Sequence, residues 1–208
     1  MSIAILASCN LPTESGDFVL HVFGDPDDGT EEVVALVHGA AGDSAPLVRL
    51  HSACFTGDLL GSLRCDCGPQ LTEALRLIGN EPYGILLYLM RHEGRGIGLV
   101  NKIKAYALQE AGLNTVDANT HLGLPVDSRD YTAAAAALQL LGVDGVRLAT
   151  NNPLKIEAVR AAGIAVTRVF HGGFVGAHNE EYLRVKDLMM GHLNARGVPA
   201  EQIPATER

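Results

Sequence analysis

From about residue 69 onward, apolar runs of strand length alternate with segments of helical periodicity, and no other feature of the sequence constrains the fold as much. Three apolar runs predict strands, at residues 84–90, 146–150 and 165–170. Helices are predicted from Pro69 and Gly98, and over residues 131–141, 153–163 and 180–193. The helix from Gly98 is expected to bury one face, formed by Leu99, Ile103, Tyr106 and Ala107. Because such alternation is typical of α/β domains with parallel strand pairing, we expect a layered α/β/α fold with a mixed, largely parallel sheet.

The first third of the chain is richer in strand signals. Runs rich in Val and Leu at residues 32–37 and 47–51 predict strands, and Gly39, Gly42 and Pro46 mark a turn between them. We expect this strand-rich N-terminal part to add antiparallel pairings to the sheet. The first 48 residues hold eight acidic residues and no Lys or Arg, which we interpret as a solvated turn.

Length and charge limit the number of domains and the kinds of partner. The chain of 208 residues has the size of one domain, which we place over residues 1–196, followed by a flexible tail at residues 197–208. The net charge of −8 argues against a nucleic-acid partner, since such proteins normally present a basic surface. No apolar run approaches the ~20 residues of a membrane span, and we find no secretory signal. We therefore expect a cytoplasmic protein without a membrane partner.

Three of the four cysteines lie close together in the sequence and predict a metal site. Cys54, Cys65 and Cys67 offer thiolates, which suit zinc, and a fourth position left to water is typical of a hydrolytic zinc. Two alternatives stay open: three unrelated reduced cysteines, or a closed structural site with His51 as the fourth ligand. Cys9 has no neighbouring ligand and is expected to be a small buried residue.

Three polar segments beside predicted strands and helices are candidates for binding a phosphorylated ligand. The glycines of residues 91–99 allow a backbone to approach an anion at the start of a helix. Residues 150–155 follow a strand, at the sheet edge where α/β proteins bind ligands. In residues 127–130, Asp127 offers a general base and Arg129 a phosphate clamp. The structural alternatives are a glycine turn, an ordinary capped loop and a surface ion pair.

Taken together, these segments resemble the stand-alone form of the GTP cyclohydrolase II family. The resemblance rests on residues 49–58, 62–71, 92–108, 115–119, 122–123, 127–131, 150–155 and 179–192, whose order and spacing agree over about residues 32–193. It implies zinc-dependent hydrolysis of GTP with release of formate and pyrophosphate. The product would be 2,5-diamino-6-hydroxy-4-(5-phosphoribosylamino)pyrimidine, in the first step of riboflavin biosynthesis. A homodimer and a Mg2+ ion that accompanies the triphosphate are also implied.

The resemblance also implies a role for each candidate residue. One zinc ion per chain would be held by Cys54, Cys65 and Cys67. Asp127 would be the proton acceptor, Arg129 the nucleophile toward the α-phosphate, and Tyr106 the residue that directs ring opening. Substrate contacts would come from Arg49, Leu50, His51, Ser52, Gln70, Glu93, Gly94, Arg95, Thr115, Thr150 and Lys155. Since arginine stays protonated in proteins, the residues alone favour Arg129 as an electrostatic clamp.

Two departures from the family pattern keep other functions open. Ala53 stands where the family usually has Glu, and residues 170–177 also differ. One alternative is a specialised paralogue with another product or pathway, and a second is a non-catalytic module that binds zinc and a nucleotide. A zinc nucleobase deaminase is not supported, because its signature needs a Pro-Cys-x-x-Cys after a His-x-Glu, and the sequence contains no Pro-Cys-x-x-Cys.

Overall fold

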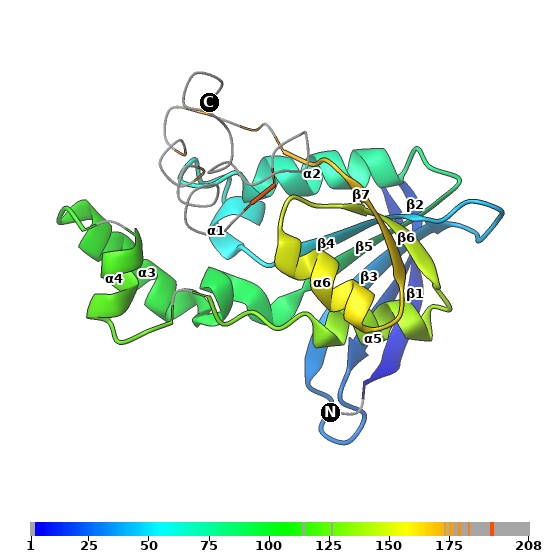
Figure 1. Cartoon of the computed structure of the whole chain (residues 1–208), viewed down its shortest axis with the longest axis horizontal. Coiled ribbons are helices and arrows are strands. Elements are labelled where there is room, and N and C mark those ends of the chain that lie inside the picture. Colours follow the sequence, from blue (N-terminus) through cyan, green and yellow to red (C-terminus); the bar gives the residue numbers. More distant parts are fainter. Residues whose placement is uncertain are drawn as a thin grey trace.

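A seven-stranded sheet forms the centre of the fold (Figure 1). The computed structural model describes residues 3–113, 115–125 and 127–172, together with residues 174, 176, 179, 183, 192 and 193. The strands are β1 (Ala4–Thr13), β2 (Gly16–Gly24), β3 (Glu31–Gly39), β4 (Leu47–Ser52), β5 (Tyr83–Leu89), β6 (Gly145–Ala149) and β7 (Ala165–Val169). Their order across the sheet is β1-β2-β3-β5-β4-β6-β7, so β5 lies between two strands that precede it in the chain.

The sheet changes from antiparallel to parallel pairing at β5. Strands β1, β2, β3 and β5 pair antiparallel in that order. Strand β4 pairs in parallel with β5 on one side and with β6 on the other, and β6 pairs in parallel with β7. Because β4, β5 and β6 are parallel, their carboxyl ends meet at one edge of the sheet, which is the edge that carries ligands in such folds.

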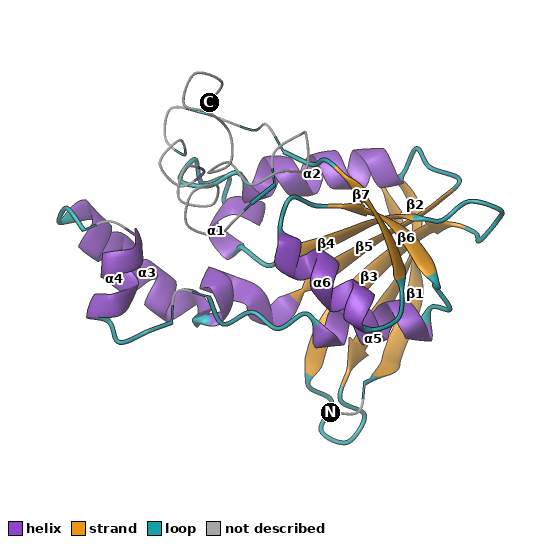
Figure 2. Cartoon of the chain, viewed as in Figure 1, coloured by secondary structure: helices purple, strands orange, loops and turns teal. Residues whose placement is uncertain are grey.

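Helices cover both faces of the sheet (Figure 2). The helical elements are α1 (Phe55–Asp58), α2 (Cys67–Ile78), η1 (Met90–Gly96), α3 (Gly98–Glu110), α4 (Thr115–His121), α5 (Thr132–Leu140) and α6 (Pro153–Ala161). Helix α2 packs Ala74 and Ile78 against Leu47 and Leu86 of one face. Helices α5 and α6 cover the opposite face, so the sheet separates two hydrophobic cores.

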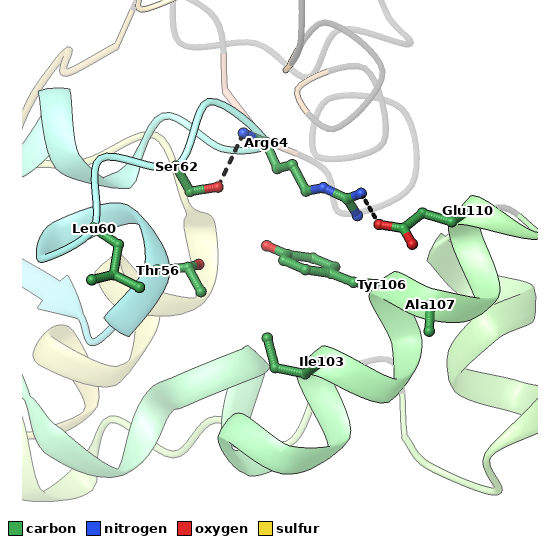
Figure 3. A pocket seen from close by; sticks show the side chains of 8 residues that line it. All are labelled: Thr56, Leu60, Ser62, Arg64, Ile103, Tyr106, Ala107 and Glu110. Atoms are coloured by element: carbon green, nitrogen blue, oxygen red, sulfur yellow. Dashed lines mark hydrogen bonds and ion pairs between the residues drawn. The ribbon is translucent and has the colours of Figure 1, made fainter.

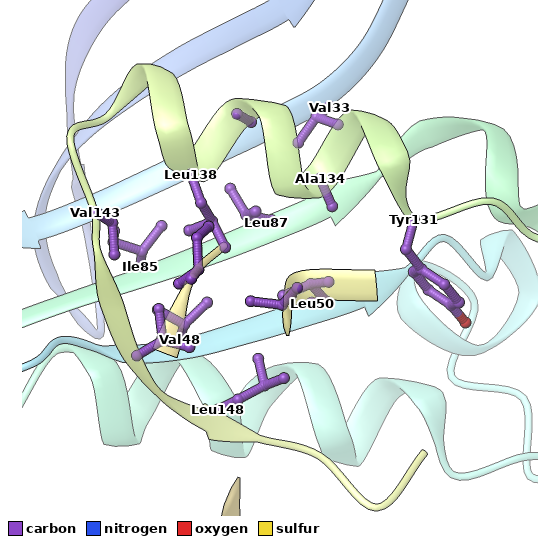
Figure 4. Close-up of a cluster of buried hydrophobic side chains, with 14 of the residues drawn as sticks. Val33, Val48, Leu50, Ile85, Leu87, Tyr131, Ala134, Leu138, Val143 and Leu148 are labelled. Atoms are coloured by element: carbon purple, nitrogen blue, oxygen red, sulfur yellow. The ribbon is translucent and has the colours of Figure 1, made fainter. Parts of the chain in front are cut away.

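The larger core is built from alternate residues of the central strands (Figure 4). Val48 and Leu50 of β4 lie beside Ile85 and Leu87 of β5, and all four side chains have no exposed surface. Leu138 of α5 is equally buried against them. Since side chains alternate between the faces of a strand, Arg49 and His51 of β4 point away from this core.

These observations confirm the expected layered α/β fold with a mixed sheet and a strand-rich N-terminal part. The predicted strands at residues 84–90, 146–150 and 165–170 agree with β5, β6 and β7 to within one residue at either end. The helix predicted over residues 180–193 and the tail at residues 197–208 lie largely or wholly outside the described residues. Within the described ranges, no helix has the length and hydropathy of a membrane span.

Two local predictions are wrong. Cys9 is exposed, because β1 is an edge strand most of whose residues face solvent. The expected buried face of α3 is also incorrect: Leu99 and Ile103 are 37% and 48% exposed, whereas Lys102 and Ala105 are buried. Helix α3 leaves the sheet and packs mainly against η1 and α4, so its inner face meets polar groups such as Glu93 instead of an apolar sheet (Figure 1).

Candidate active site

The three clustered cysteines converge beyond the carboxyl end of β4. The sulfur atoms of Cys54, Cys65 and Cys67 all lie within 4.8 Å of one another. Cys54 and Cys65 are buried, and their sulfurs are 3.7 Å apart. Two sulfurs bound at about 2.3 Å to one tetrahedral zinc would lie about 3.8 Å apart. The three side chains therefore fit a metal of this kind, as the sequence predicts.

Two glycines allow this convergence. A Cβ atom on Gly57 of α1 would lie 2.8 Å from the Cys65 sulfur and 3.1 Å from the Cys54 sulfur. A Cβ on Gly68 of α2 would lie 2.5 Å from the carbonyl oxygen of Gly57. The contacts of 2.8 and 2.5 Å are shorter than a real Cβ tolerates, and the contact of 3.1 Å is tight. The two helices can approach backbone to backbone only because both positions lack a side chain.

The hydrogen bonds within the cluster favour a thiolate on Cys54. Cys65 and Cys67 hydrogen-bond to the Cys54 sulfur and, together with the Lys102 ammonium, lower the pKa of Cys54. The bond to Cys54 raises the pKa of Cys65. Thiolates are the form in which cysteine binds a metal.

His51 does not complete the cluster as a fourth ligand. Its Nε2 donates to the two carboxylate oxygens of Asp58 at 3.0 and 3.1 Å. Asp58 also accepts from the backbone N–H of Cys54 at 3.0 Å and from the Tyr88 hydroxyl at 2.9 Å. Burial lowers the pKa of His51. Asp58 thus ties β4, β5 and the first cysteine together, and the described geometry argues against the closed site with His51.

Glu93 and Lys102 link the cysteine cluster to the glycine-rich loop. Glu93 accepts from the Lys102 ammonium at 2.7 Å and from the backbone N–H of Phe55 at 2.6 Å. The Lys102 ammonium also donates to the Cys54 sulfur at 3.1 Å. At the turn of this loop, Gly94 and Arg95 adopt positive φ angles of 60° and 65°. A left-handed conformation is unusual for arginine, and such conformations concentrate at functional sites.

Asp127 and Arg129 form a half-buried pair beside this loop. Arg129 donates from Nε and Nη2 to the two Asp127 oxygens at 2.9 and 2.5 Å. Burial acts to raise the pKa of Asp127, but hydrogen bonds and charge from Arg129 outweigh it and lower that pKa. The backbone N–H of Ser128 donates to the Arg95 carbonyl at 3.1 Å, which joins the two loops. The side chains are 18% and 11% exposed, so the pair is not a surface ion pair.

A second group of predicted residues forms a buried polar cluster under the same edge. Arg49 donates from Nη1 to the Ala149 carbonyl at 2.8 Å and from Nη2 to the side-chain oxygen of Gln70. Lys155 donates to the Leu50 carbonyl at 2.7 Å, and Thr150 lies in the same buried region. Burial lowers the pKa of Arg49 to about 10, so the guanidinium stays charged at neutral pH. The Leu50 side chain itself belongs to the hydrophobic core.

Tyr106 lines a cavity of about 330 Å3 between α3 and the segment that follows α1 (Figure 3). Its hydroxyl points toward Thr56, whose Oγ1 lies 3.8 Å from the Cys54 sulfur. The Arg64 guanidinium lies 4.7 Å from the centre of the Tyr106 ring and pairs with Glu110. Burial raises the pKa of Tyr106. Tyr106 therefore faces a cavity beside the cysteines, whereas the sequence placed it in a buried stripe.

The structure adds supporting residues that the sequence analysis did not single out. The Ser52 hydroxyl donates to Nδ1 of His92 at 3.2 Å, and Nε2 of His92 donates to the Asp130 carbonyl at 2.8 Å. His171 donates from Nε2 to the Gln70 carbonyl at 3.1 Å. Burial lowers the pKa of both histidines to about 4, so both are neutral at pH 7. Thr115 opens α4, but its side chain lies outside the described part of the chain.

Comparison with known proteins gives consistent matches over almost the whole chain. A family model described as GTP cyclohydrolase II matches residues 4–171. The chain is 51% identical over 195 residues to GTP cyclohydrolase-2 of Azotobacter vinelandii, covering 93% of each chain. It is also 51% identical over 191 residues to GTP cyclohydrolase-2 of Neisseria gonorrhoeae, covering 90% of this chain and 95% of that protein.

Two further matches are to longer proteins. The chain is 50% identical over 194 residues to the riboflavin biosynthesis protein RibBA of Salinispora tropica, covering 92% of this chain and 48% of that protein. Among solved structures, it matches a two-domain 3,4-dihydroxy-2-butanone 4-phosphate synthase from A. baumannii at 19% identity, with a TM-score of 0.45. That match covers 83% of this chain and 41% of the other.

Proposed function

This chain belongs to the GTP cyclohydrolase II family, and we propose that its sheet edge divides the family's reaction between two groups of residues. The activity is the hydrolysis of GTP in riboflavin biosynthesis. The observation that carries the division is the convergence of three cysteine sulfurs within 4.8 Å of one another, in a cluster to which Asp127 contributes no ligand atom. One group acts on the guanine ring and the other on the triphosphate.

For the ring, we propose that Cys54, Cys65 and Cys67 hold one Zn2+ per chain. The buried sulfurs, their spacing and the lowered pKa of Cys54 support this assignment. When bound, zinc would supply hydroxide at neutral pH, because it lowers the pKa of its water to about 7. Tyr106 is the ring-side residue of this chain, since its hydroxyl points toward Thr56 next to the cysteines.

For the triphosphate, we propose that Arg129 is an electrostatic clamp and Asp127 a proton acceptor. The Arg129 guanidinium is held on two nitrogens by Asp127, so its charge has a fixed position. Bond cleavage between the α- and β-phosphates develops negative charge on the departing pyrophosphate, which a fixed guanidinium stabilises. The lowered pKa of Asp127 keeps its carboxylate deprotonated at neutral pH, which is the form that accepts a proton. A Mg2+ ion bound to the triphosphate would also stabilise the negative charge of the departing pyrophosphate.

We propose that the remaining predicted residues bind and orient GTP. Arg49, Thr150 and Lys155 are buried beneath the sheet edge, where Arg49 contacts the partly buried Gln70, and His51 and Ser52 lie at the end of β4. Gly94 and Arg95 form the tight turn of the glycine-rich loop, where a backbone can approach a phosphate closely. The Glu93 carboxylate accepts a hydrogen bond from the backbone N–H of Gly94 in that turn. Thr115 lies at the start of α4. The backbone of Leu50, rather than its side chain, takes part in this cluster.

The test separates formate release from pyrophosphate release. Cys54→Ser is expected to lose formate release while keeping some pyrophosphate release, with Cys9→Ser, at an exposed cysteine, as its control. Arg129→Ala is expected to impair pyrophosphate release, with Arg160→Ala as its control. Circular dichroism of each variant must match that of wild type. Wild-type formate release from a folded Cys54→Ser protein would refute the assignment.

The same assay distinguishes the alternative functions. A specialised paralogue would release a pyrimidine of another mass, and a non-catalytic module would bind GTP without turnover. Mass spectrometry of the product decides between these and 2,5-diamino-6-hydroxy-4-(5-phosphoribosylamino)pyrimidine.

We also propose that the chain acts as a cytoplasmic homodimer without a nucleic-acid or membrane partner. Leu59, Leu60 and Leu63 are 66–71% exposed on the segment after α1, and exposed apolar clusters are typical of interaction sites. Sedimentation equilibrium would show the mass of a dimer, and a monomer at micromolar concentration would contradict the proposal. Limited proteolysis that removes only residues beyond 196 would support a single domain with a flexible tail.

A further inference from the structure

Lys102 is a buried cation in direct contact with the cysteine cluster. Its side chain is 9% exposed, and its ammonium lies 3.1 Å from the Cys54 sulfur and 2.7 Å from Glu93. It comes from α3, 48 residues after Cys54, so the contact depends on the tertiary fold. In the proposed reaction, Lys102 belongs neither to the metal ligands nor to the residues that bind GTP.

Burial of a lysine is costly, and Glu93 alone does not account for its position. A buried ammonium needs partners for its charge and its N–H groups. Glu93 supplies one of these partners, but the same carboxylate also accepts from the backbone N–H groups of Phe55 and Gly94. The ammonium lies between this carboxylate and the sulfur, where it contacts both.

We infer that Lys102 is a positioning residue of the metal centre, which donates a hydrogen bond to the Cys54 sulfur and offsets the charge of three thiolates around a divalent cation. This inference rests on the proposed metal site. Three thiolates and one Zn2+ carry a net charge of −1, and a neighbouring ammonium compensates that charge. A hydrogen bond to a thiolate also withdraws electron density from the sulfur, so the bound metal stays a stronger Lewis acid.

Glu93 helps to position Cys54 through a hydrogen bond to the backbone. Its second oxygen accepts from the N–H of Phe55, the residue directly after Cys54. The Glu93–Lys102 pair therefore holds Cys54 at two points, at its sulfur and through the adjacent peptide. Outer partners of this kind orient metal ligands, and their loss typically costs about 10- to 100-fold in metal affinity or activity.

The experiment compares Lys102→Met with Lys104→Met. Lys104 lies two residues along the same helix and is exposed, so its variant controls for loss of a lysine from α3. Zinc affinity is measured by competition with a chromophoric chelator. Each protein is also loaded with Co2+, whose thiolate-to-metal charge-transfer band reports electron density on the sulfurs.

We expect Lys102→Met to bind zinc about 10- to 100-fold more weakly and to shift the cobalt charge-transfer band to lower energy. Its kcat for formate release should fall with little change in KM. Lys104→Met should match wild type in every readout, and Lys102→Arg, which keeps the charge, should recover part of the zinc affinity. If Lys102→Met does not fold, Lys102→Gln replaces it with the same expectations.

Two outcomes overturn the inference, and they are distinguishable. If wild type and Lys102→Met bind zinc equally and share one cobalt spectrum, Lys102 has no role at the metal and the proposed function stands. If wild type binds neither metal, the proposed metal site fails and the inference fails with it.

Discussion

Gly57→Ala would place a methyl group among the three cysteines. An added Cβ would lie 2.8 Å from the Cys65 sulfur, 3.0 Å from Cβ of Cys67 and 3.1 Å from the Cys54 sulfur. Ordinary contacts begin near 3.4 Å, so at least one sulfur must move by about half an ångström. Overpacking of this kind costs about 1–3 kcal/mol. If the metal site bears that cost, zinc binding weakens about 5- to 150-fold, since 1.4 kcal/mol is a factor of ten.

The effect should be confined to the metal site. Gly57 lies in α1 without a positive φ, and alanine is a better helix former than glycine, so the backbone itself gains no strain. Zinc affinity is measured by chelator competition and folding by circular dichroism. Gly42→Ala is the control, because an added Cβ there has no neighbour within 4 Å and no positive φ. Zinc affinity of Gly57→Ala equal to that of Gly42→Ala would show that the cysteines do not bind metal in this arrangement.

Three further predictions concern stability, pH and the ring-side residue. Leu138→Ala should lower the free energy of unfolding in urea by about 2–5 kcal/mol, whereas Leu140→Ala on the exposed face of α5 should cost far less; equal costs would contradict the assigned core. His92 and His171 have pKa values of about 4 in the folded protein, below the 6.5 of an unfolded histidine. Between pH 4 and 6.5 the unfolded chain therefore binds more protons than the folded chain. The free energy of unfolding should fall as the pH drops through this window. His92→Gln should reduce the number of protons taken up on unfolding at pH 5.5 by nearly one. Tyr106→Phe should keep its zinc but slow or truncate the reaction, and an unchanged rate and product would show that the hydroxyl is dispensable.

The sequence predicted β5 because its apolar run is buried on both faces of the sheet. In β5, five consecutive apolar residues follow Gly84, and the structure buries most of them. Strand β1 has no comparable apolar run, because both of its faces are largely exposed. Its residues therefore show no alternation between buried apolar and exposed polar positions. The cysteine cluster was predictable for another reason: its ligands lie within 14 residues, so spacing alone limits their separation.

The partners of that cluster could not be predicted. Lys102 comes from α3, beyond β5, and reaches the Cys54 sulfur only through the tertiary fold. The same holds for His92, which contacts Ser52, two residues before Cys54. The helical spacing of the apolar residues predicted that they form the buried face of α3, because that kind of prediction assumes that a helix packs against an apolar surface. The actual neighbours are Glu93 and a thiol, so the buried residue is a lysine. Periodicity predicts which face meets a hydrophobic core, but it cannot identify a face that meets charged groups.

The position of β5 in the sheet imposes an order on assembly. Strands β3 and β4 run antiparallel to each other and are joined by a loop of seven residues, which is the geometry of a hairpin. In the native sheet they do not touch, because β5 lies between them. On the ribosome β3 and β4 emerge first, and local pairing is faster than pairing that must await a later segment. If β3 and β4 pair in the nascent chain, that pairing must open before β5 can insert between them.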